Sequence, residues 1–147
     1  MKVILVRPSY KSHIITPPLG IGYLAAYLKS DGIEVKIIDG LRNKLTKEQI
    51  LKVILMEKPD AVGITCLTAF YNETITLANA VKKNNIRTII GGVHPTFLPY
   101  STLMDSRADF VICGDGEIAF VKLIKNNFNN SGIKGVYSLK DLKAMTI

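Results

Sequence analysis

The sequence is poor in cysteine and contains no tryptophan. Among 147 residues there are only two cysteines, Cys66 and Cys113. Two cysteines are too few for a disulfide-stapled scaffold, and they exclude any cluster motif that needs three cysteines of this chain. Both stand in apolar runs, which predicts buried thiols. This cysteine usage fits a reducing, intracellular compartment, and we expect a cytoplasmic protein.

Long apolar runs are also missing. The N-terminal run at residues 3–6 is stopped by Arg7 and Pro8, so it is too short for the core of a signal peptide. No other stretch approaches the roughly 20 apolar residues that a membrane-spanning helix requires. We therefore expect a soluble protein without a membrane partner.

Basic residues outnumber acidic ones, 19 to 12, but they are not clustered. The formal net charge is +7, yet most basic residues are scattered lysines and only four are arginines. A nucleic-acid-binding surface usually concentrates its positive charge, often beside aromatic residues. No such run occurs, so we expect no nucleic-acid partner. Hydrophobic residues make up 48% and charged residues 21%, which excludes a disordered chain.

Short β-branched runs alternate with helical patterns five times along the chain. Thr16 before Pro17 indicates the start of the first helix, and Thr46 with Gln49 forms the capping-box pattern of the second. Strands are expected at residues 3–6, 35–38, 61–64, 88–90 and 110–113, and helices at about 17–28, 46–58, 70–84, 100–104 and 117–128, with a proline-bounded loop before the fourth helix.

This alternation predicts the fold class. Strands that are apolar on both faces and separated by helices indicate a parallel sheet covered on both sides. With right-handed crossovers, the leading topology is a doubly wound α/β domain, Rossmann-like or flavodoxin-like, with five strands in the order 2-1-3-4-5. We assign residues 1–130 to this domain. Residues 131–147 are expected to form an edge strand or the start of a linker, with residues 135–143 loosely ordered.

Candidate binding residues follow the strands, because ligands of open α/β sheets bind beyond the carboxyl ends of the strands. They are Pro17, Leu19 and Gly20 after the first strand, Thr65, Cys66, Leu67 and Thr68 after the third, Gly91, Gly92, Val93 and His94 after the fourth, and Gly114, Asp115, Gly116 and Glu117 after the fifth. Each cluster alone is explained by close packing, a turn or a helix start. Together they predict a large ligand held mainly by backbone groups.

Common catalytic and metal-binding signatures are absent. Gly20-Ile21-Gly22 lacks the spacing of a dinucleotide fingerprint, and no Gly-Lys-Ser/Thr phosphate loop occurs. The two histidines, His13 and His94, pair with no carboxylate or thiol at metal-ligand spacing. We expect neither a catalytic residue nor a metal ligand in this chain.

Four stretches occur in a fixed order: Pro-Pro-Leu-Gly-Ile-Gly-Tyr-Leu-Ala-Ala-Tyr-Leu at 17–28, Gly-Ile-Thr at 63–65, Gly-Gly-Val-His-Pro-Thr at 91–96 and Gly-Asp-Gly-Glu at 114–117. With them the chain resembles the N-terminal cobalamin-binding domain of cobalamin-dependent radical SAM enzymes, over about residues 1–137. The resemblance implies a domain that holds cobalamin, with its cobalt, at the carboxyl edge of the sheet. It also implies a C-terminal barrel that carries an iron–sulfur cluster and SAM, commonly for methyl transfer.

Two departures from the resembled enzymes shape our expectations. The barrel and its three cysteines are absent, so we expect no catalysis from this chain alone and a radical SAM barrel, in cis or in trans, as its partner. The Asp-x-His-x-x-Gly motif of methionine-synthase-type domains is also absent, so we expect cobalamin with its benzimidazole off the cobalt and no protein histidine in its place. The nucleotide tail would lie against Thr65, Gly91 and Gly92, and Leu19 and Leu67 would pack on the corrin.

Two alternatives stay open from the sequence. The fold could have lost the cofactor and serve as a scaffold or interaction domain. Alternatively, the same loops could hold the phosphate of FMN or another nucleotide, as in flavodoxin-like modules.

Overall fold

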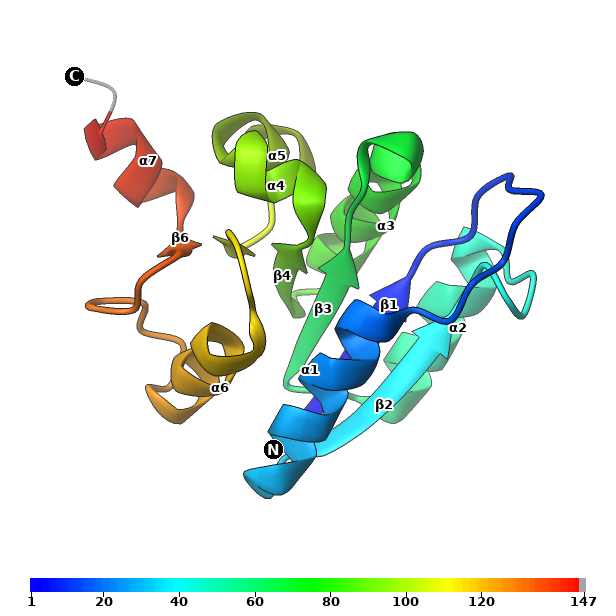
Figure 1. The fold of residues 1–147 in the computed structure, drawn as a ribbon, viewed down its shortest axis with the longest axis horizontal. Helices are drawn as coiled ribbons and strands as arrows, with labels where there is room; N and C mark the ends of the chain where they lie inside the picture. Colours follow the sequence, from blue (N-terminus) through cyan, green and yellow to red (C-terminus); the bar gives the residue numbers. More distant parts are fainter. Residues whose placement is uncertain (146–147) are drawn as a thin grey trace.

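Six strands form one sheet in the order β2-β1-β3-β4-β5-β6 (Figure 1). The structure is a computed structural model that describes residues 1–145. The strands are β1 (Lys2–Arg7), β2 (Glu34–Asp39), β3 (Ala61–Thr65), β4 (Arg87–Gly91), β5 (Phe110–Ile112) and β6 (Val136–Tyr137). The strands β1 to β5 pair in parallel, and β6 pairs antiparallel to β5. The predicted order 2-1-3-4-5 is confirmed, and the tail, predicted to form an edge strand or the start of a linker, adds β6 as a sixth strand at the edge of the sheet.

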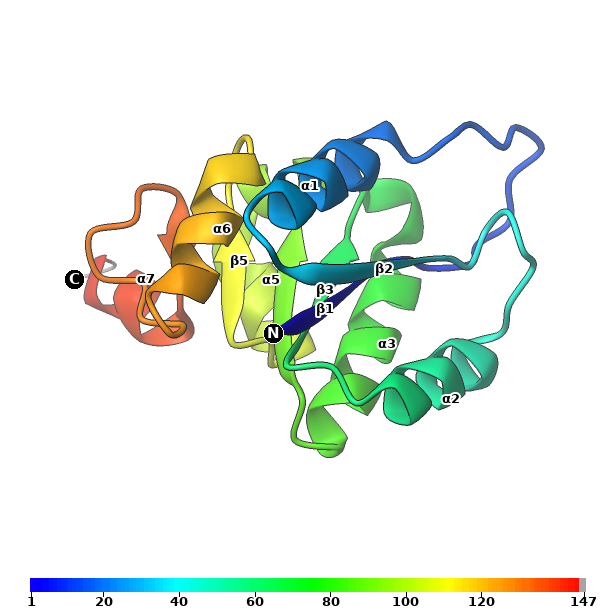
Figure 2. The ribbon, with the colours of Figure 1, turned by 90° about the horizontal axis from the view of Figure 1, so that it is seen from below.

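Helices cover both faces of this sheet. They are α1 (Leu19–Ser30), α2 (Lys47–Glu57), α3 (Tyr71–Lys83), α4 (Val93–Phe97), α5 (Pro99–Ser106), α6 (Glu117–Lys125) and α7 (Leu139–Met145), with a short 3-10 turn, η1 (Thr68–Phe70), before α3. Figure 2 shows α1 and α6 on one side of the sheet and α2 and α3 on the other. No helix within residues 1–145 is long and apolar enough to cross a membrane.

The central strand β1 shows why the strands are apolar throughout. Val3 and Leu5 pack into the core formed with α1 and α6, whereas Ile4 and Val6 pack into the core formed with α2, α3 and α5. All four side chains are at most 1% exposed. Because both faces of a parallel sheet are covered, its strands lose the alternation of apolar and polar residues.

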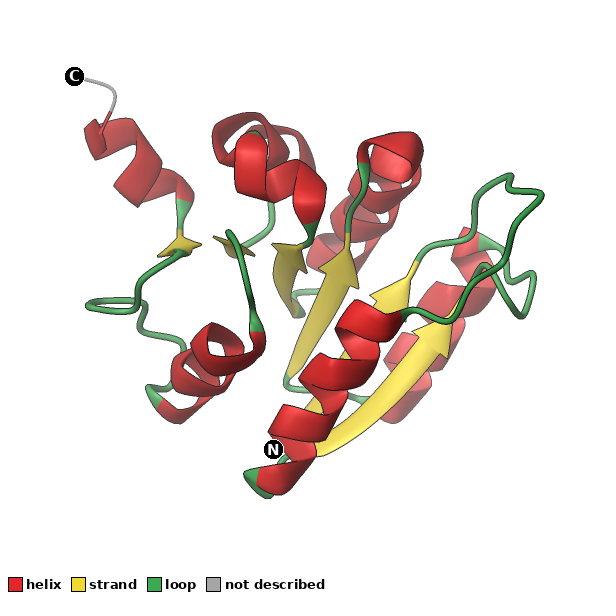
Figure 3. Cartoon of the chain, viewed as in Figure 1, coloured by secondary structure: helices red, strands yellow, loops and turns green. Residues whose placement is uncertain are grey.

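The start of α1 differs from the prediction. Thr16 does not cap the helix, which begins at Leu19 with Pro18 at its N-cap and no side-chain cap. The carbonyl oxygen of Thr16 instead accepts a hydrogen bond of 2.8 Å from Nη1 of Arg7. Arg7 also donates to both carboxylate oxygens of Asp39, at 2.9 and 2.6 Å. The long loop between β1 and α1, green in Figure 3, is thereby tied to the ends of β1 and β2.

The start of α2 follows the prediction. The hydroxyl of Thr46 accepts a hydrogen bond of 3.1 Å from the Gln49 backbone N–H, and Oε1 of Gln49 accepts one of 2.8 Å from the Thr46 backbone N–H. This reciprocal capping box satisfies two N–H groups at the helix start. The helix ends at Glu57, and its C-cap residue Lys58, directly before Pro59, has a left-handed φ of +48°.

Two segments are more ordered than the sequence predicted. The proline-bounded loop after β4 contains helix α4, which begins directly after Gly92. The stretch 135–143 was expected to be loosely ordered, but it forms β6 and α7, and Leu142 is buried. The carboxylate of Asp141 accepts hydrogen bonds of 2.7 Å from the N–H and hydroxyl of Ser138, and these bonds lower its pKa. Residues 146–147 of the predicted tail lie outside the described residues.

Candidate functional site: a glycine-lined cleft at the carboxyl edge

The carboxyl ends of the parallel strands meet at one edge of the sheet, and a cleft opens there between α1 and α6. Its volume is about 190 Å³. Eight of the predicted binding residues line it: Gly20, Thr65, Gly91, Gly92, Gly114, Asp115, Gly116 and Glu117. The predicted loops after the first, third, fourth and fifth strands therefore all contribute to one site.

Glycines leave the walls of the cleft bare. A Cβ atom built on Gly20 or Gly114 would meet no protein atom within 4 Å, so a side chain at either position would extend into free space. Gly63 differs, because its Cβ would lie 2.8 Å from Cδ2 of Leu5. The walls thus give a ligand direct access to the backbone, whereas the floor at Gly63 is tightly packed.

The floor of the cleft consists of apolar residues that the sequence analysis did not name as binding residues. They are Leu5, Ile21, Leu24, Gly63, Ile64, Ile89, Ile112 and Phe120. In the sequence they look like ordinary core positions of strands and helices. The available signal was Gly63, since a glycine inside a β-branched strand often marks a close approach of another group.

The loops after β3 and β4 are fastened to each other. The backbone N–H of Cys66 donates to the carbonyl of Gly91 at 2.8 Å, and the N–H of His94 donates to the carbonyl of Cys66 at 3.2 Å. Gly92 lies between them with a φ of +112°, and a Cβ there would lie only 2.6 Å from the Cys66 carbonyl oxygen. The close contact between these two loops therefore requires glycine at position 92. This contact fixes the rim of the cleft.

His94 is buried at the carboxyl edge of the sheet and does not line the cleft. Its Nδ1 lies 2.9 Å from Oγ1 of Thr68, and its ring lies against that of Tyr71, with ring centroids 4.3 Å apart. The hydroxyl of Tyr71 donates to Oδ2 of Asp105 at 2.5 Å. Burial and this hydrogen bond raise the pKa of Tyr71, so its hydroxyl stays protonated.

The loops after β4 and β5 are also joined. The hydroxyl of Thr96 accepts a hydrogen bond of 2.9 Å from the N–H of Gly114 and donates one of 2.7 Å to the carbonyl of Gly92. Asp115 and Glu117 follow this junction and line the cleft. Within residues 1–145, neither carboxylate forms a hydrogen bond or ion pair, so both can accept hydrogen bonds from a ligand.

The thiols are not suited to nucleophilic chemistry. Burial raises the pKa of Cys66 to about 11 and also raises the pKa of Cys113, which keeps both protonated. Cys66 is buried as predicted, but Cys113 is only half-buried, with its Sγ 3.4 Å from the carbonyl oxygen of Pro95. Among residues 1–145, no group of three or more His, Cys, Asp or Glu side chains could hold a metal ion.

Four other predicted residues are exposed beside the cleft rather than lining it: Pro17, Leu19, Leu67 and Val93. Leu19 is 65% exposed and directly precedes Gly20, while Val93 is 57% exposed and directly follows Gly92. Leu67 follows β3 and is 40% exposed. These side chains give the carboxyl edge an apolar outer surface.

A larger open groove, of about 510 Å³, lies among α2, α3 and the loop after β1. Its lining includes the apolar residues Pro8, Leu45 and Ile50 and the charged residues Lys47 and Glu73. None of the predicted binding residues lines this groove. The smaller cleft, not the larger groove, therefore unites the predicted site.

Comparisons with known proteins identify related chains. An uncharacterised methyltransferase of Pyrococcus horikoshii is 36% identical over 148 residues, covering 95% of this chain and 32% of that protein. The anaerobic magnesium-protoporphyrin IX monomethyl ester cyclase of Rubrivivax gelatinosus is 35% identical over 84% of this chain and 24% of its own length. This chain thus spans about a quarter to a third of the curated relatives it matches.

A solved structure has the same fold. It is the radical S-adenosylmethionine methyltransferase TsrM of Kitasatospora setae with cobalamin and a [4Fe-4S] cluster bound. The TM-score is 0.82 at 20% identity, and the match covers 93% of this chain and 28% of TsrM. The model of the B12 binding domain family matches residues 10–124, which is most of the sequence. The chain therefore belongs to the B12-binding domain family, whose ligand is cobalamin.

Proposed function

We propose that this chain holds cobalamin at the carboxyl edge of its sheet, as the cofactor-binding module of a radical SAM enzyme. The nucleotide tail enters the cleft between α1 and α6, and the corrin lies across the loops outside it. The observation that carries the proposal is the set of bare glycine walls at Gly20, Gly91 and Gly114, where no side chain fills the space.

The size of the cleft supports a placement in which only the nucleotide tail enters it and the corrin stays outside. The volume of the cleft is about 190 Å³. It is smaller than the roughly 300–1,000 Å³ of pockets that enclose whole ligands. The cleft can therefore accept one end of a large ligand, such as a heterocyclic tail on its floor of Leu5, Ile89 and Phe120.

The exposed apolar side chains suit the other part of the cofactor. Leu19 and Leu67 stand beside the cleft where the flat corrin would lie, and packing against it would remove them from water. The chain lacks the Asp-x-His-x-x-Gly motif that supplies a histidine to the cobalt in methionine-synthase-type domains. We therefore propose that no histidine of this chain replaces the benzimidazole at the cobalt.

When bound, cobalamin supplies a cobalt that accepts and passes on a methyl group. This chain contributes binding and orientation: Asp115 and Glu117 accept hydrogen bonds from amide or hydroxyl groups of the ligand, and the apolar floor excludes water from the tail. An iron–sulfur cluster is held by cysteine thiolates, and this chain has only two cysteines. We therefore propose a radical SAM domain, in cis or in trans, as the partner.

The methyltransferases among the relatives favour methyl transfer as the reaction of the whole enzyme. Two free cysteines, Cys66 and Cys113, are consistent with a reducing compartment, so we place the enzyme in the cytoplasm.

Incubated anaerobically with cobalamin, SAM and a strong reductant, this chain alone should show neither cluster absorbance nor cleavage of SAM. Either signal would contradict the proposal that this chain binds cobalamin while a separate radical SAM domain carries the cluster and SAM.

The direct test is an absorbance titration of the purified chain with hydroxocobalamin, and parallel titrations with FMN and SAM. We expect saturable binding of hydroxocobalamin only, with a spectrum that shows the benzimidazole displaced from the cobalt. Saturable binding of FMN instead would favour a flavodoxin-like module, and binding of none of the three would favour a scaffold without a cofactor.

A further inference from the structure

We propose that His94 binds the rim of the corrin through its Nε2 atom, and that Thr68 and Tyr71 are positioning residues that hold its ring in place. This inference rests on the proposed function, because it assigns a role to one residue within the same site. It concerns a hydrogen bond to a carboxamide of the corrin periphery and not a bond to the cobalt.

The first observation is that one ring nitrogen of His94 is free although the residue is only 7% exposed. Nδ1 contacts the Thr68 hydroxyl, but Nε2 has no hydrogen-bond partner among residues 1–145. No fully buried side-chain nitrogen or oxygen of these residues lacks a partner. It follows that Nε2 reaches solvent while the rest of the ring is enclosed.

The second observation is that the ring is held from several sides. Thr68 fixes Nδ1 at 2.9 Å, and the ring of Tyr71 lies against the imidazole at a tilt of 31°. Tyr71 is itself anchored by Asp105 on α5. The backbone N–H of His94 is bonded to the carbonyl of Cys66. A ring held in this way loses little conformational freedom when its free nitrogen binds a ligand, and this preorganisation favours affinity.

The third observation is the position of His94 relative to the cleft. Gly91 and Gly92 line the cleft, but His94, two residues later, does not. Its neighbours Leu67 and Val93 are exposed side chains of the carboxyl edge. His94 therefore lies outside the compartment assigned to the nucleotide tail, on the side of the carboxyl edge where α3 begins. The proposal requires that the corrin extends over this side of the edge.

The chemistry of the two partners is complementary. The periphery of the corrin carries carboxamide groups, which both donate and accept hydrogen bonds. A neutral imidazole has one donor nitrogen and one acceptor nitrogen. Because the Thr68 hydroxyl can also donate or accept, either tautomer of His94 leaves an Nε2 that can pair with a carboxamide.

The test compares two substitutions of His94 by titration with hydroxocobalamin. His94→Asn places an amide near the position of Nδ1, so it keeps the Thr68 contact and removes the group at Nε2. His94→Gln reaches further and restores a polar group near Nε2. Loss of one ligand hydrogen bond should weaken hydroxocobalamin binding about tenfold in His94→Asn. In His94→Gln the affinity should return to within about threefold of the unmodified chain.

Thr68→Val is a second variant, since Thr68 is exposed and its loss should not endanger folding. It removes only the anchor of Nδ1, and we expect about threefold weaker binding. Repeating all titrations with dicyanocobinamide, which lacks the nucleotide tail, locates the contact. The same tenfold loss in His94→Asn with both ligands supports a contact to the corrin rim.

Several results would overturn the proposal. They are equal affinity of all three variants and the unmodified chain, a loss in His94→Gln but not in His94→Asn, or disappearance of the loss with dicyanocobinamide. An absorbance change showing that the unmodified chain has a nitrogen ligand on cobalt, absent in His94→Asn, would also overturn it. If the unmodified chain binds no hydroxocobalamin, the proposed function itself fails, which is a different result from normal binding by His94→Asn.

Discussion

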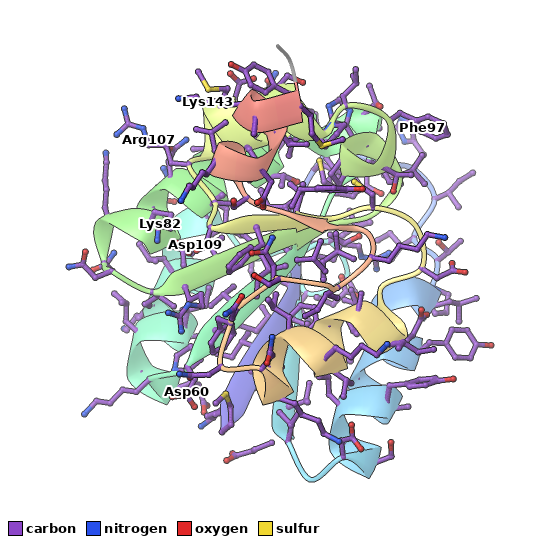
Figure 4. All side chains as sticks on the ribbon, turned by 90° about the vertical axis from the view of Figure 1, so that its left-hand side faces the viewer. Asp60, Lys82, Phe97, Arg107, Asp109 and Lys143 are labelled. Atoms are coloured by element: carbon purple, nitrogen blue, oxygen red, sulfur yellow. The ribbon has the colours of Figure 1, made fainter. Side chains whose placement is uncertain are left out.

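The two edges of the sheet are built differently. At the amino edge, Lys2 pairs with Glu57 at 2.5 Å, and Lys82 pairs with Asp109 at 2.9 Å. The carboxylate of Asp109 also accepts the backbone N–H of Thr88 at 2.8 Å. Figure 4 shows Lys82 and Asp109 side by side, with Phe97 of the opposite edge projecting on the other side of the view. The amino edge is thus closed by charged side chains that satisfy one another.

At the carboxyl edge, by contrast, glycines stand at the end of β4 and after β5, and the side chains of Asp115 and Glu117 form no ion pair within residues 1–145. The exception is the corner of β1 and β2, where Arg7 and Asp39 are paired and buried. The same strands therefore form two different edges. Their amino ends make a closed edge that supports stability, and their carboxyl ends make an open edge that can bind a ligand. This division is general for open α/β sheets, whose ligands bind at the carboxyl ends of the strands.

The largest expected effect on stability concerns the Arg7–Asp39 pair at the carboxyl ends of β1 and β2. Arg7 is 6% exposed and Asp39 is 8% exposed. Burial alone would raise the pKa of Asp39, but hydrogen bonds from Arg7 and from the backbone outweigh it and lower the pKa. Arg7→Met leaves a buried carboxylate without its partner, and we expect a loss of about 3 kcal/mol in the free energy of unfolding, measured with urea.

The matched control for Arg7→Met is Arg107→Met, because Arg107 is exposed and forms no ion pair within residues 1–145. It should change the free energy of unfolding by less than about 0.5 kcal/mol. Equal losses in the two variants would show that the Arg7–Asp39 pair does not stabilise the corner.

A smaller effect distinguishes the floor of the cleft from its wall. In Gly63→Ala the new methyl group would lie 2.8 Å from Leu5 and 3.1 Å from the ring of Phe120, so these side chains must shift. We expect a loss of about 1–3 kcal/mol in the free energy of unfolding. Gly20→Ala meets no atom within 4 Å and removes a flexible helical glycine, so it should be neutral or slightly stabilising. The reverse order in thermal unfolding would contradict the described packing.

The smallest effect concerns the amino edge and its response to acid. Hydrogen bonds from Lys2 and Lys36 lower the pKa of Glu57 from 4.5 to about 2. Because the pKa in the folded state is lowered, the stabilisation is present above pH 4.5 and is lost as the pH falls towards 2. The difference in melting temperature between the unmodified chain and Glu57→Gln should therefore shrink over this range.

The control for the acid response is Glu48→Gln, whose carboxylate is largely exposed at a long 3.8 Å distance from Lys47. Its melting temperature should follow that of the unmodified chain at every pH. Neither substitution should change the affinity for hydroxocobalamin, since both residues lie away from the cleft. A change in the hydroxocobalamin affinity of Glu57→Gln would contradict the proposal that the amino edge serves stability and not ligand binding.

The sequence predicted the strand order because both-face burial leaves a strong signal, as in β1. It did not predict where α1 begins, since the Thr16 carbonyl is held by Arg7, a contact between residues that no local pattern reveals. It missed α4 because Gly91-Gly92 and Pro95 are typical of a turn, whereas the backbone bond from His94 to Cys66 stabilises a helical turn there.

The candidate site was predicted only in part for a related reason. Loop residues such as Gly114 are conspicuous in sequence, because glycines and carboxylates interrupt apolar runs. The floor residues Leu5, Ile89 and Phe120 come from separate elements and become neighbours only through the packing of α1 and α6. Tertiary contacts of this kind decide which apolar residues line a cleft and which fill a core.

The central claim is that the cleft holds the nucleotide tail of cobalamin, and Gly20→Leu tests it most directly. A leucine at Gly20 would fill the cleft, whereas Gly22→Leu on the same helix is a matched control, because Gly22 also meets no atom within 4 Å but does not line the cleft. We predict that Gly20→Leu weakens hydroxocobalamin binding by more than about tenfold, through loss of about 1.4 kcal/mol or more. Gly22→Leu should bind normally, and dicyanocobinamide, which lacks the tail, should bind both variants alike. Normal hydroxocobalamin affinity in Gly20→Leu, with the fold intact by circular dichroism, would contradict the account.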